Sequence, residues 1–390
     1  MKIAFIIGLP IPYPGAAWVR IESFVKSSVK RGHSVLIICT EKRMKSPYLI
    51  DTPFRRRGFL NIFSFFITTL TNILRHRIDV AVISVPPGIH AFGASLACYI
   101  LRKKIVFDYR DQWEEYLISK TTNKVKRVLY KILKALMTIL YSKATLVVTV
   151  TPPFIEYLSK RGVKNVHLIP NGADISLFKP VHDKTSLRAK YGFENDEFIL
   201  VYSGYIGRYY RLDTCVEAFA RFIETNYFKK TKLLLMGEGG DLEKILELSK
   251  ILKIEENVRY MGVKYDKKEI AELIALADVG LIPYDKNPLW RNSLPAKFFE
   301  YASCGIPVIA TIESKSILAE IIDREKIGIH VEPGDIKKLT DAINLLSTDK
   351  YFLEEVSKRA RKLIEREFDR VKISQNFLNL IEKYLPVSAR

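Results

Sequence analysis

The chain has 390 residues, of which 48% are hydrophobic and 27% charged, and its net charge is +19. This composition is typical of globular proteins and excludes a disordered or fibrous chain. The length exceeds that of one ordinary hydrophobic core and predicts two α/β domains.

Short β-branched runs alternate with amphipathic stretches, as in parallel sheets with crossover helices. Lys2 leads directly into the first run, so we expect no signal peptide. The strands predicted in the first half are Lys2–Gly8, Ser34–Cys39, Val80–Val85, Lys104–Tyr109, Ala144–Thr149 and Val166–Ile169. Those in the second half are Phe198–Ser203, Lys232–Met236, Asn257–Met261, Val279–Pro283, Pro307–Ala310 and Gly328–Val331. Two sets of six strands predict an α/β fold of two Rossmann-like, doubly wound parallel-sheet domains.

The Pro-Asn-Gly sequence that begins at Pro170 interrupts this alternation and marks a domain boundary near residues 170–180. We expect an N-terminal domain over residues 1–175 and a C-terminal domain over residues 176–368. Residues 369–390 are expected to form a helix that packs back on the first domain.

The positive charge is concentrated in the first half of the chain. Residues 1–180 contain 28 Lys and Arg against 10 Asp and Glu, whereas the other 210 residues contain 34 against 33. Such an excess favours polyanionic partners, of which anionic lipids and nucleic acid are the candidates. Nucleic acid is the weaker candidate because no nucleic-acid-binding module is recognisable.

Two long segments of this half are rich in apolar residues. Lys124–Lys143 carries Arg127, Lys131 and Lys134 at helical spacing, which predicts either a basic helix on an anionic membrane surface or a helix packed on the sheet. The uncharged run Gly58–Leu74 leaves two readings open, a transmembrane helix, against which its many polar residues argue, and a helix packed on the sheet.

The segment Asn292–Ala310 has the most specific pattern of the chain. A polar turn at Ser293 and Leu294 precedes a helix in which Lys297 and Glu300 share one face. The free N–H groups at the start of such a helix suit a diphosphate. A carboxylate one turn further can accept two hydrogen bonds from a ribose diol, although a Lys–Glu pair on a helix is more often a solvated ion pair.

This segment resembles the donor-site signature of glycosyltransferase family 4, retaining enzymes of the GT-B fold in which two Rossmann-like domains face a cleft. The family pattern is Glu, seven residues and Glu, followed by a Gly-x-Pro-Val strand. Glu300 matches the second Glu, which in the family binds the nucleotide ribose. Asn292 replaces the first Glu and brings no charge to the donor sugar. The Ser-Leu-Pro-x-Lys sequence resembles a branch that acts in surface-polysaccharide and lipopolysaccharide assembly.

Other segments occur in the order that the resemblance implies. Tyr202–Arg208 resembles the first strand and loop of the nucleotide domain, where basic residues bind the diphosphate. Arg208 is the first candidate for this role and Arg211 the second. The second strand ends in a Gly-x-Gly loop, and the third ends where the family contacts the base through backbone atoms. The residues that the resemblance assigns to donor binding are Gly15, Arg208, Arg211, Gly237, Gly239, Met261, Asn292, Ser293, Leu294, Lys297 and Glu300.

The first half carries the remaining candidates. Gly15 resembles the family's glycine loop near the donor phosphate, and Arg110 and Asp111 stand where the family often has a His-Asp pair near the transferred sugar. Trp113 and His90 are acceptor-site candidates, and each of these residues also suits a structural role. The catalytic candidates are Asp111, Arg110, Arg208 and Lys297.

The resemblance implies an enzyme that moves a sugar from a nucleotide-sugar donor to a glycan or lipid-linked acceptor. The family retains anomeric configuration without an evident nucleophile, so its residues stabilise the departing diphosphate and an oxocarbenium-like sugar. No Asp-x-Asp occurs in the chain, and we expect neither a metal nor another cofactor.

The basic first half and four scattered cysteines without metal or redox spacing favour a cytoplasmic enzyme that is peripheral on the inner face of the membrane. The alternative is a soluble GT-B enzyme that acts on a small molecule, either a glycosyltransferase or a nucleotide-sugar epimerase.

Overall fold

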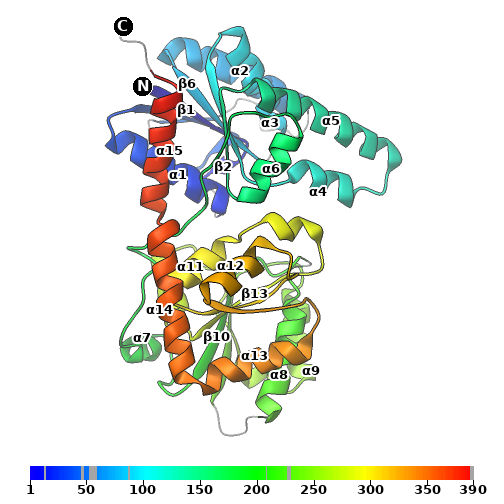
Figure 1. Cartoon of the computed structure of the whole chain (residues 1–390), viewed down its shortest axis with the longest axis vertical. Coiled ribbons are helices and arrows are strands. Elements are labelled where there is room, and N and C mark those ends of the chain that lie inside the picture. Colours follow the sequence, from blue (N-terminus) through cyan, green and yellow to red (C-terminus); the bar gives the residue numbers. More distant parts are fainter. Residues whose placement is uncertain are drawn as a thin grey trace. The chain divides into compact units, whose positions relative to one another are not determined.

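The computed structural model describes residues 1–12, 15–44, 48–51, 59–86, 88–207, 209–225 and 230–386 (Figure 1). The chain forms two compact units, one of Met1–Pro170 with Val371–Arg390 and one of Asn171–Arg370. Each unit has a parallel sheet with helices on both faces.

The first unit contains a seven-stranded parallel sheet in the order β5-β3-β1-β6-β7-β8-β9. Its strands are β1 (Lys2–Ile7), β3 (Ser34–Cys39), β5 (Leu49–Asp51), β6 (Val80–Val85), β7 (Lys104–Tyr109), β8 (Leu146–Thr149) and β9 (Val166–Leu168). All six predicted strands are present, with ends within two residues. The edge strand β5 and the separate pair of β2 (Pro10–Ile11) and β4 (Glu41–Lys42) were not predicted, because each strand is too short to show an apolar run.

Alternate residues of each strand face opposite layers of helices. Ile3 and Phe5 of β1 lie in the core formed with α1 (Ala16–Lys30) and α15 (Arg370–Tyr384). Phe24 of α1 stacks on Phe377 of α15 with ring centroids 4.0 Å apart, and the two helices run side by side in Figure 1. The other face is covered by α2 (Phe59–His76), α3 (Ile89–Ile100), α5 (Lys124–Lys143) and α6 (Pro152–Lys160).

Within this layer, α2 and α3 approach each other closely at Gly93. A Cβ added there would lie 2.0 Å from the Ile62 carbonyl oxygen and 2.8 Å from the Phe66 nitrogen. The uncharged run of α2 is therefore a helix packed in the first unit, one of the two readings that the sequence left open.

The second unit has the strand order β12-β11-β10-β13-β14-β15, all parallel. Its strands are β10 (Phe198–Ser203), β11 (Thr231–Met236), β12 (Val258–Tyr260), β13 (Val279–Pro283), β14 (Val308–Thr311) and β15 (Gly328–Val331). All six are the predicted strands, with ends within one residue. The order reverses between β10 and β13, and such a switch point is where open parallel sheets bind ligands.

Two helical layers cover this sheet. One contains α8 (Leu212–Thr225), α9 (Leu242–Ile251) and α13 (Ile336–Thr348). The other contains α10 (Lys267–Ala275), α11 (Ala296–Ser303), α12 (Ile317–Glu325) and α14 (Lys350–Glu367). The short helices α4 (Trp113–Lys120) and α7 (Thr185–Lys190) lie in connections, as do the 3₁₀ helices η1 (Glu255–Asn257) and η2 (Pro288–Asn292).

We predict that Gly93→Ala lowers the free energy of unfolding by about 1–3 kcal/mol, because the added methyl forces α2 away from α3. The better helix propensity of Ala, about 1 kcal/mol, offsets only part of this loss. Urea denaturation followed by circular dichroism measures the effect. Gly240→Ala is the matched control, since nothing lies within 4 Å of a Cβ at that position. Equal stability of the two variants would contradict the tight helix contact.

Candidate functional site

The strands of the second unit end in closely packed glycine loops. A Cβ on Gly237 would lie 1.9 Å from the Gly204 carbonyl oxygen, and one on Gly239 would lie 1.9 Å from the Ile206 carbonyl oxygen. Both glycines also have a positive φ, so another residue would require the backbone to move. The loops after β10 and β11 therefore pack backbone against backbone at the carboxyl edge of the sheet.

Lys297 extends from the first turn of α11 toward the loop after β10. Its Nζ would lie 3.5 Å from a Cβ built on Gly204, and it lies 3.9 Å and 4.0 Å from the ring centroids of Tyr202 and Tyr210. Lys297 is 6% exposed, and its Nζ has no hydrogen-bond partner among the described residues. Buried charged groups are almost always paired, so an unpaired amine at this edge indicates a place for an anion.

Burial lowers the pKa of Lys297 to about 7. The Glu300 carboxylate favours the ammonium and opposes this shift, as do the negative faces of the two tyrosine rings. The loss of hydration is the larger effect, because no hydrogen bond to Nζ replaces the lost water.

Glu300 lies one turn after Lys297 on the same helix, as the sequence predicted. It is half-buried, and desolvation raises the pKa of its carboxyl. The positive charges of Arg370, Lys297 and Lys267 oppose the shift, Arg370 most strongly. A carboxylate so placed can accept hydrogen bonds from a diol.

Aromatic residues around Lys297 are the part of this site that the sequence analysis missed. Tyr210 lies 5.2 Å from Tyr284, which stacks on Trp290 at 4.9 Å, all centroid distances. Trp290 also donates a hydrogen bond from Nε1 to Asp285 Oδ1. These rings connect Lys297 to η2. The tyrosines are visible in the sequence, but only the fold shows that Tyr202 and Tyr210 surround Lys297.

The predicted donor residues Asn292, Ser293 and Leu294 connect η2 to α11. Asn292 is the last residue of η2, and Ser293 Oγ donates to the Leu289 carbonyl at 3.4 Å. All three residues are half-buried and directly precede the α11 N-terminus, whose first N–H groups have no partner within the helix.

Three other residues were predicted to bind the donor. Arg208 is outside the described residues. Arg211 forms an exposed ion pair with Asp213 at 2.8 Å and lines a pocket of about 880 Å³ between α8 and α9, so its guanidinium already has a carboxylate partner. The Met261 nitrogen donates to the Leu235 carbonyl at 2.9 Å, which continues the backbone pairing of β11 and β12.

In the first unit, Arg110 is committed to a buried network. It donates from Nε to Ser84 Oγ at 3.0 Å and from Nη2 to the Pro86 carbonyl. Asp108, beside it, forms a fully buried ion pair with Arg20 at 2.9 Å. These bonds give Arg110 the surroundings of a structural residue, and contact with a substrate stays a prediction.

The other first-unit candidates differ in exposure. Asp111 is exposed, and Gly15 is the N-cap of α1. His90 is 1% exposed and packs on Phe65, and burial lowers the pKa of the imidazole to about 3. Trp113 is also buried and donates to Tyr141 Oη at 3.4 Å. The surroundings of His90 and Trp113 fit a structural role, and their contact with an acceptor stays a prediction.

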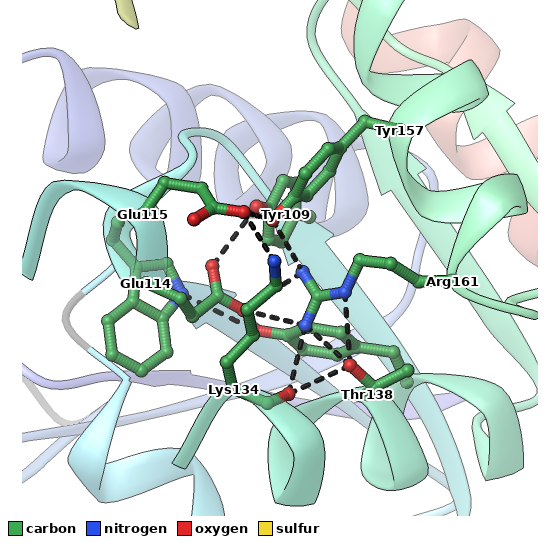
Figure 2. Close-up of polar contacts among 9 residues, drawn as sticks. Tyr109, Glu114, Glu115, Lys134, Thr138, Tyr157 and Arg161 are labelled. Atoms are coloured by element: carbon green, nitrogen blue, oxygen red, sulfur yellow. Dashed lines mark hydrogen bonds and ion pairs between the residues drawn. The ribbon is translucent and has the colours of Figure 1, made fainter. Parts of the chain in front are cut away.

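A polar cluster beneath α4 and α5 determines which side of α5 faces the core (Figure 2). The buried Glu114 carboxylate accepts from Tyr109 at 3.1 Å and pairs with Arg161 at 3.4 Å. Burial raises the pKa of Glu114, and the Arg161 charge opposes this. Lys134 of α5 forms an ion pair with Glu115. Lys134, predicted to face a membrane, is thus held on the inner side of the helix by a carboxylate.

The opposite side of α5 is apolar and exposed. Only Met137 and Tyr141 of this helix are buried. Six apolar side chains at positions i, i+3, i+4, i+7, i+11 and i+14 are between 47% and 69% exposed and form the outer stripe of α5: Val125, Val128, Leu129, Ile132, Leu136 and Ile139. Arg127 and Lys131 are exposed too. In Figure 1, α4 and α5 extend together from the rest of the unit.

No helix within the described ranges combines the length and hydropathy needed to cross a bilayer. In the same part of the chain, no three His, Cys, Asp or Glu side chains are grouped so that they could hold a metal ion. Metal independence stays a prediction. The cysteines Cys39, Cys98, Cys215 and Cys304 are buried free thiols.

Two family models match successive parts of the chain. The model of Glycosyltransferase Family 4 matches residues 17–177, and that of Glycosyl transferases group 1 matches residues 183–363. N-acetyl-alpha-D-glucosaminyl L-malate synthase from Bacillus anthracis is 30% identical over 50% of this chain and 48% of its own length. UDP-Gal:alpha-D-GlcNAc-diphosphoundecaprenol alpha-1,3-galactosyltransferase from Escherichia coli is 26% identical over 53% and 51%. The chain thus spans about half the length of these curated relatives.

Solved structures match over nearly the whole chain. The crystal structure of HepE from Anabaena in complex with UDP-glucose has a TM-score of 0.74 and 18% identity, covering 98% of this chain and 100% of that one. Sucrose-phosphate synthase from Thermosynechococcus elongatus has the same TM-score at 19% identity and full coverage of both chains. The two family models together cover most of the chain and show that it belongs to glycosyltransferase family 4, and the solved structures show that it has the GT-B fold.

Proposed function

We propose that the protein is a retaining glycosyltransferase that moves a sugar from a nucleoside diphosphate sugar to a lipid-linked or polysaccharide acceptor at the cytoplasmic surface of a membrane. The observation that carries the donor assignment is the buried, unpaired amine of Lys297 beside the α11 N-terminus. An amine and the free N–H groups of a helix N-terminus both attract a diphosphate.

The donor then lies along α11. The diphosphate contacts Lys297 and the first turn, and the ribose diol donates to the Glu300 carboxylate one turn later. Asn292, Ser293 and Leu294 border the place of the transferred sugar. The chemistry is the departure of a nucleoside diphosphate, so positive groups near the leaving oxygen lower the barrier without a metal. Arg208, outside the described residues, is the further cation proposed for this task, and Asp111 of the first unit stays a catalytic candidate.

The relatives support this class of donor. One solved structure of HepE contains UDP-glucose, and the Escherichia coli relative is named for UDP-Gal and a GlcNAc-diphosphoundecaprenol acceptor. A nucleoside diphosphate sugar is therefore proposed as donor, and a lipid-linked acceptor is consistent with the second name.

We predict that Glu300→Ala weakens binding of whichever of UDP, GDP and ADP binds best by about tenfold or more, because a hydrogen bond to a charged acceptor contributes about 1.5–3 kcal/mol. Isothermal titration calorimetry measures the affinity. Glu320→Ala on α12 is the matched control, since Glu320 is exposed and pairs only with Arg324 among the described residues. Unchanged affinity in Glu300→Ala would remove Glu300 from the donor site.

The membrane proposal rests on α5 and on the charge of the first half of the chain. A helix whose exposed side is apolar and whose flanks carry Arg127 and Lys131 has the character of a helix that lies in a lipid interface. Each basic residue near an anionic surface contributes about 1 kcal/mol to the free energy of membrane binding. Burial of the outer stripe in lipid adds a hydrophobic contribution that salt does not screen.

The Bacillus anthracis relative favours an alternative acceptor, because it is named for the synthesis of a small molecule, N-acetyl-alpha-D-glucosaminyl L-malate. In that case the outer stripe of α5 would not bind lipid.

We predict that the wild-type protein co-sediments with phosphatidylglycerol vesicles at low salt but not with phosphatidylcholine vesicles. Val128→Glu with Ile132→Glu should release it, because two charges enter the outer stripe, while nucleotide affinity stays unchanged. Lys134 is not substituted in this variant, because its ion pair with Glu115 holds α5 against the unit.

The matched control for this experiment is Ile251→Glu with Leu345→Glu, which changes two exposed apolar residues of the second unit. This control should still co-sediment. If the wild type ignores anionic vesicles even at low salt, the membrane proposal is wrong and the small-molecule alternative replaces it.

A further inference from the structure

The groups that face Lys297 leave its amine without a fixed counter-charge. Tyr202 of β10 and Tyr210 of the following loop contribute ring faces at 3.9 Å and 4.0 Å. The Cys215 thiol of α8 is buried, and burial raises its pKa to about 12, so the thiol is neutral near pH 7. Glu300 of α11 is the acidic group that acts on Lys297, but its carboxylate forms no hydrogen bond with Nζ.

The surroundings of Lys297 therefore disfavour its charged form when no anion is bound. The ammonium lacks hydrogen-bond acceptors among the described residues, and a buried unpaired charge is costly. The neutral amine avoids that cost, and burial lowers the pKa to about 7. An anion placed against Nζ would reverse the preference, because an opposite charge within about 4–6 Å favours the ammonium.

We infer that Lys297 takes up a proton from solvent when a nucleoside diphosphate binds, so that the empty site holds the amine and the occupied site holds the ammonium. This inference rests on the proposed function of the same site. The proton comes from the buffer acid, whose conjugate base is left behind, and it returns when the diphosphate leaves. Donor affinity and product release are thereby linked to pH.

The direction of the pH dependence follows from the pKa of Lys297, which is lower in the free protein than in the nucleotide-bound protein. Below pH 7 the amine is already protonated, and binding takes up little. Above pH 7 Lys297 must take up a proton from solvent when the nucleotide binds, so uptake rises toward one proton per ligand. The affinity then falls by up to about tenfold per pH unit, until the pH reaches the raised pKa of Lys297 in the nucleotide-bound protein.

The test is calorimetry of the wild-type protein at pH 8 with UDP, GDP and ADP in buffers of different ionisation enthalpy. At this pH the diphosphate itself is fully ionised. The dependence of the observed enthalpy on the buffer gives the number of protons taken up, and we expect about 0.9 per bound nucleotide from a pKa of about 7. The affinity at pH 9 should be about 5–10-fold lower than at pH 8.

Lys297→Arg is the informative variant, because a guanidinium stays charged and cannot take up the proton. It should bind nucleotide with uptake near zero, and circular dichroism checks that it is folded. Wild-type binding without proton uptake would overturn the inference and leave the donor site standing. Uptake in Lys297→Arg equal to that of wild type would assign the proton to another group and overturn it as well. Failure of all three nucleotides to bind would overturn the proposed function and the inference together.

Discussion

Parallel pairing around β10 is the constraint on which the candidate site depends. Strands β11, β10 and β13 point the same way, so the loops that follow them meet at one edge of the sheet. The contact between the Gly237 and Gly204 backbones closes this edge so tightly that no side chain fits between the loops. Helix α11 brings Lys297 to the same edge, and the site is formed there from segments almost 100 residues apart in the chain.

The electrostatic character of the site comes from what is missing around Lys297 rather than from what is present. An exposed lysine would keep its water, and a paired lysine would keep its charge. Between Tyr202 and Tyr210 the amine is buried and has no hydrogen-bond partner among the described residues. Such a group gains most from an arriving anion, because that anion supplies both the charge and the acceptors that the fold withholds.

The need of a buried charged group for a partner also determines the orientation of α5. The buried Glu114 carboxylate requires Arg161, and Arg161 donates to the Lys134 carbonyl of α5 at 3.0 Å. These contacts hold one polar side of the helix against the unit. Because these polar contacts orient the helix, the outer stripe is left exposed.

The sequence by itself determined the strands, because runs buried on both faces of a parallel sheet must be continuously apolar, and it placed Lys297 and Glu300 on one helical face, because that depends only on a spacing of three residues. It also identified α5 as amphipathic. Only the tertiary structure decided which side of α5 is exposed, that Lys134 and Arg211 are occupied by neighbouring carboxylates, and that Tyr202 and Tyr210 enclose Lys297. These properties depend on contacts between residues distant in sequence, which no local pattern records, and they set the charge and hydration of each group.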